Sequence, residues 1–223
     1  MTKRRRDTSK WWTGGIQGVD VGERLRLTPY WERHIRPVDR VSVVIEPGPA
    51  FGAGDHPSTV MALGLLELAL KQAPRIAPSM LDAGTGTGVL AIAGKLLGAG
   101  YTVGFDVDPA AVYCARRNLG INGLSADHED GVSPVDLLVG TIEAIRGTFD
   151  IVAANLAAPT LMRVSARLAE CSARHLILSG IADAMEGTVL DRYLSLDFTL
   201  VERRKASEWN AFLMSAGRYS AAP

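Results

Sequence analysis

Cysteine is scarce in this sequence, and its cysteines do not form a redox or metal-binding motif. Only Cys114 and Cys171 occur, without a C-x-x-C pair, which argues against a disulfide framework and against a cysteine zinc site. No metal site is expected from the histidines either, because the four of them lack ligand-type spacing: His34, His56, His128 and His175. We therefore expect a protein of the reducing cytoplasm.

The sequence also lacks a secretory h-region and any apolar run of about 18 residues, so neither export nor a membrane span is predicted. An excess of charge is missing as well, since 24 Lys and Arg residues balance 24 Asp and Glu residues. The net charge therefore predicts no attraction to nucleic acid or to a membrane surface.

What is present is a chain of 223 residues with 47% hydrophobic residues, enough for the core of one large domain. Residues 1–18 begin with "MTKRRRDTSK" and predict a basic, flexible arm, for which a weak contact of residues 3–10 with RNA or an acidic surface is the alternative to a solvated tail. Residues 19–223 are expected to form the domain. Its first part, residues 19–40, alternates apolar and polar side chains and predicts a lead-in hairpin.

From residue 41 onward, strand patterns and helix patterns alternate. Strands are predicted at 41–47, 79–84, 101–107, 135–140, 149–156 and 175–181, and helices at 56–71, 88–100, 109–123, 159–173 and 184–196. Asp55 or Ser58 is expected to cap the first of these helices, and Asp108 the third. Two β-rich runs, 198–206 and 208–216, lie too close together for a helical crossover and predict an antiparallel hairpin. The fold class is therefore α/β, a doubly wound Rossmann-like sheet that is mostly parallel and ends in an antiparallel hairpin.

The stretch "LDAGTGTG" places three glycines at the turn between a predicted strand and its helix. Gly84, Gly86 and Gly88 let the backbone approach a ligand closely, and the helix N-terminus favours polar or anionic groups, which indicates a ligand with a nucleoside. The dinucleotide fingerprint G-x-G-x-x-G fails in detail, because its third glycine would fall on Val89. Asp82 would also face the negative pyrophosphate, so a cationic ligand suits the turn better.

S-adenosylmethionine is such a ligand, because it carries a sulfonium, an ammonium and one nucleoside. Its ribose needs an acidic acceptor at the end of the next strand, and Asp106 stands about 20 residues downstream of the glycines. The residues therefore predict S-adenosylmethionine as the cofactor. A nicotinamide-dependent oxidoreductase and a cofactor-binding protein without catalysis stay open as alternatives.

Successive motifs of this chain resemble those of the class I methyltransferases that modify bacterial ribosomal protein L11 (PrmA type). The resemblance runs from about Val19 to Met214 through "IEPGPAFGAGDHPSTVMALGLLE", "LDAGTGTGVLAIAGKLLGAG", "VGFDVDPAAV", "FDIVAANLAAP" and "LILSGI", and "PGPAFGAGDHPST" is its most specific part. It implies that residues 19–223 are a class I methyltransferase domain that transfers methyl to nitrogen, with a protein amine as acceptor.

Two features of this chain depart from the family pattern. Asp55 stands where the family usually has threonine. The separate N-terminal domain that recognises the ribosomal protein in the family is expected to be missing, so a methyltransferase for another protein or for a small molecule stays open. The acceptor would then be held by the catalytic domain itself, by the basic arm with Trp11 and Trp12, or by a partner subunit.

Asn155 is the first candidate for catalysis, because it ends a predicted strand at the ligand edge and its side-chain carbonyl can orient an amine. The alternative is that Asn155 caps the helix that begins near Pro159. His56 is the second candidate, as a general base, against a role in bonding its own loop or lining the pocket. The complete cofactor-binding set, in which Phe51 and Thr59 rest on the resemblance and Thr141 is placed beside the adenine, is Phe51, Thr59, Asp82, Gly84, Gly86, Gly88, Asp106, Thr141 and Asn155.

Overall fold

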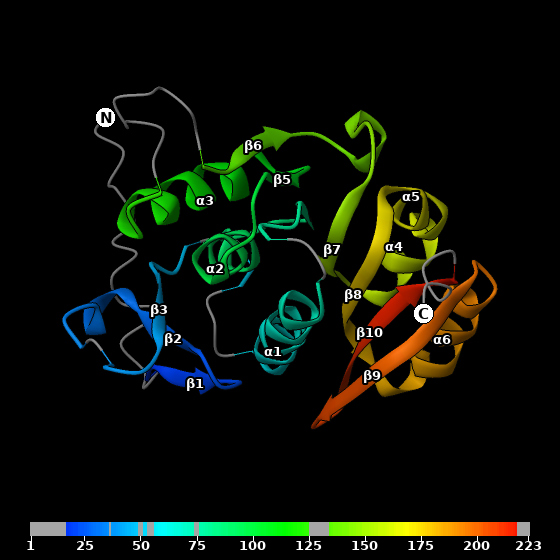
Figure 1. Cartoon of the computed structure of the whole chain (residues 1–223), viewed down its shortest axis with the longest axis horizontal. Coiled ribbons are helices and arrows are strands. Elements are labelled where there is room, and N and C mark those ends of the chain that lie inside the picture. Colours follow the sequence, from blue (N-terminus) through cyan, green and yellow to red (C-terminus); the bar gives the residue numbers. More distant parts are fainter. Residues whose placement is uncertain are drawn as a thin grey trace, which may run out of the picture.

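The computed structural model of this chain describes residues 17–35, 37–48, 51–52, 56–73, 76–124 and 134–217. Within them, a seven-stranded sheet forms the centre and a three-stranded sheet lies beside it (Figure 1). The strands of the larger sheet, in spatial order, are β6 (Asp136–Val139), β5 (Thr102–Asp106), β4 (Met80–Ala83), β7 (Phe149–Asn155), β8 (Ser172–Ala182), β10 (Trp209–Ala216) and β9 (Phe198–Ala206).

The pairing of these strands confirms the predicted fold class. Strands β6, β5, β4, β7 and β8 are parallel, whereas β10 is antiparallel to both β8 and β9. The chain builds outward from β4 through β5 to β6, and then returns to place β7 on the other side of β4. The topological switch therefore lies between β4 and β7, where a doubly wound sheet opens a crevice at its carboxyl edge.

Helices cover both faces of the sheet, and the sheet separates two hydrophobic cores, one on each face (Figure 1). One face carries α1 (Pro57–Gln72), α2 (Val89–Leu97) and α3 (Pro109–Ile121), and the other carries α4 (Ala158–Arg163), α5 (Ser165–Cys171) and α6 (Glu186–Leu194). Strands β4, β7 and β8 lie between the two layers, and their apolar side chains are buried on both faces as expected for central parallel strands.

Two helix predictions need correction, and one is confirmed. Helix α1 is capped by His56, whose ring accepts a hydrogen bond from the Ser58 amide, so the prediction of Ser58 as cap is wrong and Asp55 lies outside the described residues. The single helix predicted at 159–173 is two helices, because Val164 leaves helical geometry with φ −98° and ψ 9°. Asp108 caps α3 as predicted, accepting from the Ala110 amide.

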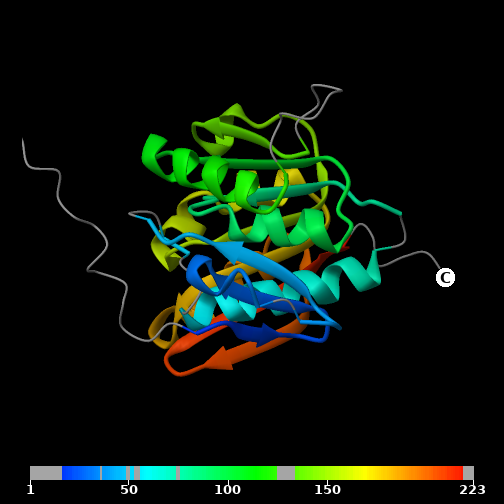
Figure 2. The same cartoon turned by 90° about the vertical axis from the view of Figure 1, so that its left-hand side faces the viewer.

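The predicted lead-in hairpin is present as β1 (Val19–Val21) and β2 (Leu25–Pro29). The strand predicted at 41–47 is β3 (Val41–Ile45), and it pairs in parallel with β2 in the three-stranded sheet instead of joining the larger one. Figure 2 shows this small sheet lying over α1 and α2, and its apolar face shares their core. The hairpin is thus bound to the body of the protein by hydrophobic burial.

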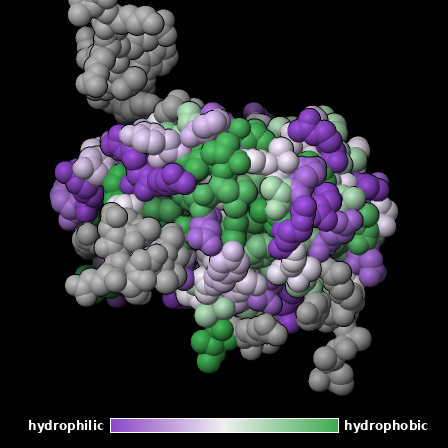
Figure 3. Space-filling model, turned by 90° about the horizontal axis from the view of Figure 1, so that it is seen from above, coloured by the Kyte–Doolittle hydropathy of each residue, from purple (hydrophilic) through white to green (hydrophobic). Residues whose placement is uncertain are grey.

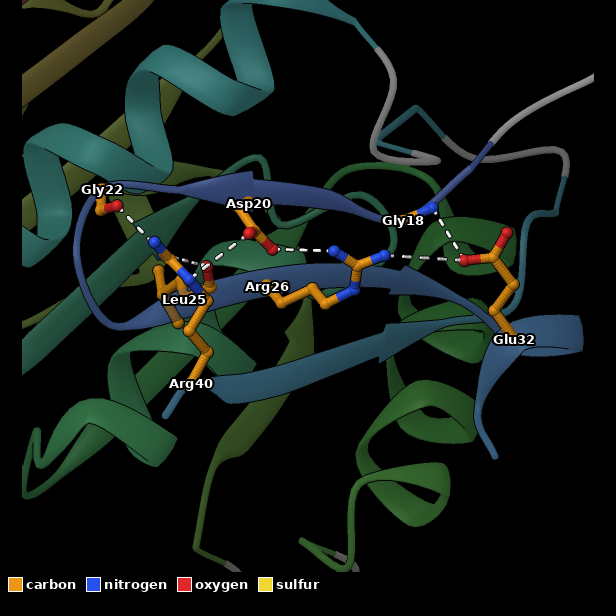
Figure 4. A network of polar contacts seen from close by, with 7 residues as sticks. All are labelled: Gly18, Asp20, Gly22, Leu25, Arg26, Glu32 and Arg40. Carbon is orange, nitrogen blue, oxygen red and sulfur yellow. Dashed lines mark hydrogen bonds and ion pairs between the residues drawn. The ribbon is translucent and has the colours of Figure 1, made fainter. Parts of the chain in front are cut away.

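Ion pairs hold the connections of the small sheet together (Figure 4). Arg26 on β2 lies between Asp20 on β1, at 2.8 Å, and Glu32 in the helical turn η2 (Tyr30–Glu32), at 4.0 Å. Arg40 pairs with Asp20 and donates to the carbonyls of Gly22, in the turn, and Leu25, at the start of β2. Because these side chains are partly exposed, each pair adds only modest stability, of about 1 kcal/mol or less.

The β6 edge of the large sheet is partly exposed. Leu137 and Leu138 are half-buried and Val139 is 52% exposed.

The face of the molecule seen from above carries an apolar area in its middle with hydrophilic side chains around it (Figure 3). Among the described residues, no helix is long and apolar enough to span a bilayer.

Candidate active site

A cavity of about 420 Å³ opens at the carboxyl ends of β4, β5, β7 and β8, beside the topological switch. It is lined by Phe51, His56, Ser58, Gly84, Gly86, Asp106, Asp108, Ala111, Asn155, Leu156, Ala157, Gly180 and Trp209. Six of the predicted site residues are among them: Phe51, His56, Gly84, Gly86, Asp106 and Asn155. No cluster of His, Cys, Asp and Glu suited to a metal ion occurs within the part of the chain that the structure describes.

The glycine turn can adopt its shape only with glycines. Gly84, Gly86 and Gly88 have φ angles of +73°, +54° and +83°, a region that other residues rarely occupy. A Cβ added to Gly84 would lie 2.4 Å from a methyl of Leu156, and one added to Gly86 would lie 2.4 Å from the Phe51 carbonyl oxygen. Gly88 then caps α2 without any side-chain bond, and the Ala91 amide of the first helical turn donates to the buried Asp82 carboxylate.

Asp106 ends β5 and lies across from this turn. Its Oδ2 accepts a hydrogen bond from the Gly86 amide at 3.0 Å, and its Oδ1 accepts one from the Asp108 amide at 3.0 Å. Each carboxylate oxygen can accept a further bond, so Asp106 can receive two hydroxyl donors from a ligand. This position, one strand away from the glycine turn, is the one expected from the sequence.

Asp82 lies beneath the turn and does not line the cavity. It is buried, and its Oδ2 accepts from the Thr85 hydroxyl at 2.7 Å and from the Ala91 amide at 3.1 Å. Burial raises the pKa of Asp82 to about 6, the two hydrogen bonds oppose that shift, and the charge of Asp106 adds to it. The structure therefore gives Asp82 contacts that shape the turn and the start of α2.

Asn155 ends β7 at the floor of the cavity. Its Nδ2 donates to the Thr59 hydroxyl at 3.3 Å, whereas its Oδ1 is buried and has no hydrogen-bond partner among the described residues. Helix α4 begins at Ala158 without a side-chain cap, so Asn155 does not have the capping role considered as the alternative. An unpaired buried carbonyl is costly, and a donor entering the cavity would relieve that cost.

Three aromatic rings form one wall of the cavity. The His56 ring packs edge-on between Phe51, at 5.3 Å, and Trp209, at 4.8 Å between ring centroids. His56 Nδ1 accepts from the Ser58 amide and lies 2.7 Å from the Ser58 hydroxyl. The Ser58 amide can donate only to an unprotonated Nδ1, whereas the Ser58 hydroxyl can pair with Nδ1 in either tautomer.

Trp209 was missed by the sequence analysis, which assigned it only to a β-rich run. It begins β10, where it pairs with Ala182 at the end of β8. The next residue, Asn210, donates to Asp183 at 2.8 Å, and Lys205 forms an ion pair with the same carboxylate. A tryptophan at the start of the second strand of the terminal hairpin was the available signal, but only the folded sheet brings it to the cavity.

The remaining predicted site residues lie away from the cavity lining. Thr59 is fully buried in α1 behind Asn155. Thr141 follows Gly140, whose amide donates to the Asp106 carbonyl, so Thr141 lies near the edge of the site without lining it. Asp55 and the basic arm, residues 3–10, are outside the described residues.

The cavity suits S-adenosylmethionine by its shape and by its donors and acceptors. The glycine turn forms a cradle that a Cβ would fill, and Asp106 suits a pair of hydroxyls. Aromatic rings line the remaining wall.

Comparison with known proteins gives one consistent result. The family model described as ribosomal protein L11 methyltransferase (PrmA) matches residues 3–216 of this chain. The ribosomal protein L11 methyltransferase of Pelobacter propionicus is 36% identical over 215 residues, which cover 95% of this chain and 67% of the relative. That of Myxococcus xanthus is also 36% identical, over 92% of this chain and 67% of the relative.

Solved structures agree with these sequence relatives. A ribosomal protein L11 methylase from Lactobacillus delbrueckii subsp. bulgaricus superposes with a TM-score of 0.76 at 25% identity, covering 90% of this chain and 99% of that one. A magnesium protoporphyrin IX methyltransferase from Synechocystis, with bound SAM, shares the fold at a TM-score of 0.58 and 15% identity, over 70% of this chain and 78% of that one. The methyltransferase predicted from the sequence is therefore confirmed, and the chain belongs to the ribosomal protein L11 methyltransferase (PrmA) family.

Proposed function

We propose that this chain transfers a methyl group from S-adenosylmethionine to an amine of ribosomal protein L11. The observation that carries the proposal is the unpartnered Oδ1 of Asn155, which lies at the same cavity as the glycine turn and Asp106. A site that combines a nucleoside cradle with a free acceptor for an N–H donor suits a nitrogen nucleophile.

The cofactor is S-adenosylmethionine, and its sulfonium supplies a methyl group to an attacking nucleophile. The residues that would hold it are the glycine turn, for the amino-acid part, and Asp106, for the ribose hydroxyls. Phe51 would cover its reacting end. Because methyl transfer is an in-line displacement, the main task of these residues is to hold and align the reactants.

Asn155 acts on the acceptor side. An amine attacks only when it is neutral, and a lysine side chain has a pKa of about 10.4 in water. The apolar wall of the cavity would favour the neutral amine by desolvation, and the Asn155 Oδ1 would accept a hydrogen bond from an N–H of that amine and orient its lone pair for attack. His56 keeps its Nδ1 engaged with Ser58 and shapes this wall.

Trp209 holds the stem of the acceptor side chain against the wall that it forms with His56 and Phe51. Burial of one or two CH₂ groups of that stem against the ring contributes about 0.8–1.6 kcal/mol. We therefore expect Trp209→Ala to raise the KM for the acceptor about 4- to 15-fold while leaving the affinity for S-adenosylmethionine within twofold. Trp31→Ala, at a partly exposed tryptophan in η2, is the matched control and should change neither value.

The choice of L11 rests on the relatives, which carry that protein in their names. The test is transfer of labelled methyl from S-adenosylmethionine to purified L11, to other ribosomal proteins and to small amines at equal concentration. The proposal expects L11 to acquire label at least tenfold faster than the other acceptors. Preferential labelling of another protein or of a small molecule would replace L11 as the substrate and leave the methyltransferase chemistry intact.

The basic arm gives a second, independent element of acceptor recognition. Residues 3–10 hold five basic side chains, which attract an acidic or RNA-bearing partner over about 10 Å at 0.1 M ionic strength. Deleting residues 1–10 should raise the acceptor KM at low salt and leave cofactor affinity unchanged. Equal kinetics of both proteins at low and high salt would show that the arm is a solvated tail.

A further inference from the structure

The side-chain amides of Asn118 and Asn122 hydrogen-bond to the backbone at the open edge of β3, where a neighbouring strand could otherwise pair. Asn122 exchanges two hydrogen bonds with the backbone of Val44, at 2.9 and 2.7 Å. One helical turn earlier, Asn118 accepts from the Glu46 amide at 2.9 Å and donates to its carbonyl at 3.4 Å. Two side-chain amides four residues apart, on α3 and at its C-cap, thus pair with Val44 of β3 and with Glu46 just beyond it, because both repeats are close to 6 Å.

Asn118 differs from Asn122 in one further contact. Its Nδ2 also donates to the carbonyl oxygen of Thr87, in the glycine turn, at 3.0 Å, and its side chain is 1% exposed. Asn122 instead donates to the backbone of α3 itself, at Asn118, at 2.8 Å. Only one of the two asparagines therefore links α3 and the end of β3 to the cofactor turn.

Thr87 continues this link to the segment that carries Phe51. The Thr87 amide donates to the Phe51 carbonyl at 3.1 Å, and its hydroxyl donates to the Gly52 carbonyl at 2.7 Å. Gly52 has φ +100°, and a Cβ there would lie 2.8 Å from the Thr87 hydroxyl. A Cβ on Gly48 would lie 2.8 Å from the sulfur of Cys114 on α3. The described parts of the segment, residues 46–48 and 51–52, thus lie too close to the turn and to α3 for side chains at either glycine.

We propose that Asn118 is a positioning residue for the cofactor site, because it and Thr87 latch the Phe51 segment to the glycine turn. The latch fixes the separation between the turn that cradles the cofactor and the ring that covers its reacting end. Asn118 touches neither cofactor nor acceptor, since it does not line the cavity. The inference rests on the cofactor assignment of the proposed function and is independent of the acceptor.

The test compares Asn118→Ala with Asn122→Ala, because both remove an amide that pairs with β3. The affinity for S-adenosylmethionine is measured by titration calorimetry, the Tm by thermal unfolding, and the KM for cofactor and kcat by methyl transfer. We expect both variants to lower the Tm, Asn118→Ala alone to raise the Kd and the cofactor KM about tenfold, and kcat at saturating cofactor to stay within twofold. Equal changes of Kd in the two variants, or none in either, would overturn the proposal.

A second pair guards against loss of folding in Asn118→Ala. Thr87→Val removes the hydroxyl that donates to Gly52, whereas Thr87→Ser keeps it. We expect Thr87→Val to weaken cofactor binding about five- to tenfold and Thr87→Ser to bind within twofold of the wild type. Equal affinities of the two variants would contradict the latch. Failure of the wild-type protein to bind S-adenosylmethionine would contradict the proposed function as well.

Discussion

Replacing Gly86 with alanine should destabilise the protein by more than the same replacement at Gly123. Both glycines have left-handed backbone, with φ +54° at Gly86 and +72° at Gly123. An alanine there costs about 1–2 kcal/mol from the backbone conformation alone. A Cβ at Gly123 meets nothing within 4 Å, whereas a Cβ at Gly86 would lie 2.4 Å from the Phe51 carbonyl oxygen. The difference between the two variants therefore isolates the contact between the turn and the Phe51 segment.

The size of this difference follows from the bonds that must break. Moving the Phe51 carbonyl away separates it from the Thr87 amide and strains the bond from the Thr87 hydroxyl to Gly52. Each such hydrogen bond contributes about 0.5–1.5 kcal/mol, so Gly86→Ala should lose about 1–3 kcal/mol beyond the loss at Gly123. The distorted cradle should also bind S-adenosylmethionine at least about tenfold more weakly, while Gly123→Ala should bind it normally.

Urea denaturation followed by circular dichroism measures the free energy of unfolding of both variants, and equal m-values would show that the comparison is sound. Titration calorimetry gives the cofactor affinity. If the two variants lose the same stability and bind S-adenosylmethionine equally well, the Phe51 segment does not press on the turn in solution, and the account of the cradle is wrong.

Three further predictions address the carboxylate, the amide and a buried histidine. Asp106→Ala should weaken cofactor binding by about 1.5–3 kcal/mol, roughly 10- to 150-fold, and an affinity within twofold of the wild type would remove Asp106 from the ribose site. Asn155→Ala should lower turnover while cofactor affinity stays close to that of the wild type, whereas an equal loss of both would move Asn155 to the cofactor side. Burial, assisted by the charge of Arg174, lowers the pKa of His175 to about 4 from an ordinary 6.5, so between these pH values the unfolded chain binds more protons and stability falls as the pH falls. The advantage of the wild type over His175→Gln should therefore shrink by about 3 kcal/mol between pH 7 and pH 4 in urea denaturation, and a constant difference would contradict this assignment.

The features that the sequence predicted well were those encoded by neighbouring residues. The glycine turn, the strand that ends at Asp106 and the cap at Asp108 follow from local spacing, and the structure has all three. The terminal hairpin followed from the short distance between two β-rich runs. Local rules suffice here because turn geometry and helix capping depend on a few adjacent residues.

The features that escaped prediction depend on contacts between distant segments. The strand Val41–Ile45 pairs with β2 along one edge, and Asn118 and Asn122 hydrogen-bond to the backbone at its other edge. No local sequence pattern specifies either contact. Trp209 reaches the cavity only because β10 pairs with the end of β8. Asp82 was expected to face a ligand, yet it lies beneath the turn and bonds Thr85 and Ala91. Sequence spacing predicted its neighbourhood but not the direction of its side chain.

Intact-mass spectrometry of L11 tests the central claim most directly. Purified L11 is incubated with S-adenosylmethionine and the wild-type protein, and in parallel with Asn155→Ala. The account predicts that L11 gains mass in whole methyl increments, located on amino groups by peptide fragmentation, and that the gain requires the cofactor and slows strongly with Asn155→Ala. An L11 that keeps its mass, under conditions in which the protein binds S-adenosylmethionine, would contradict methyl transfer to this acceptor.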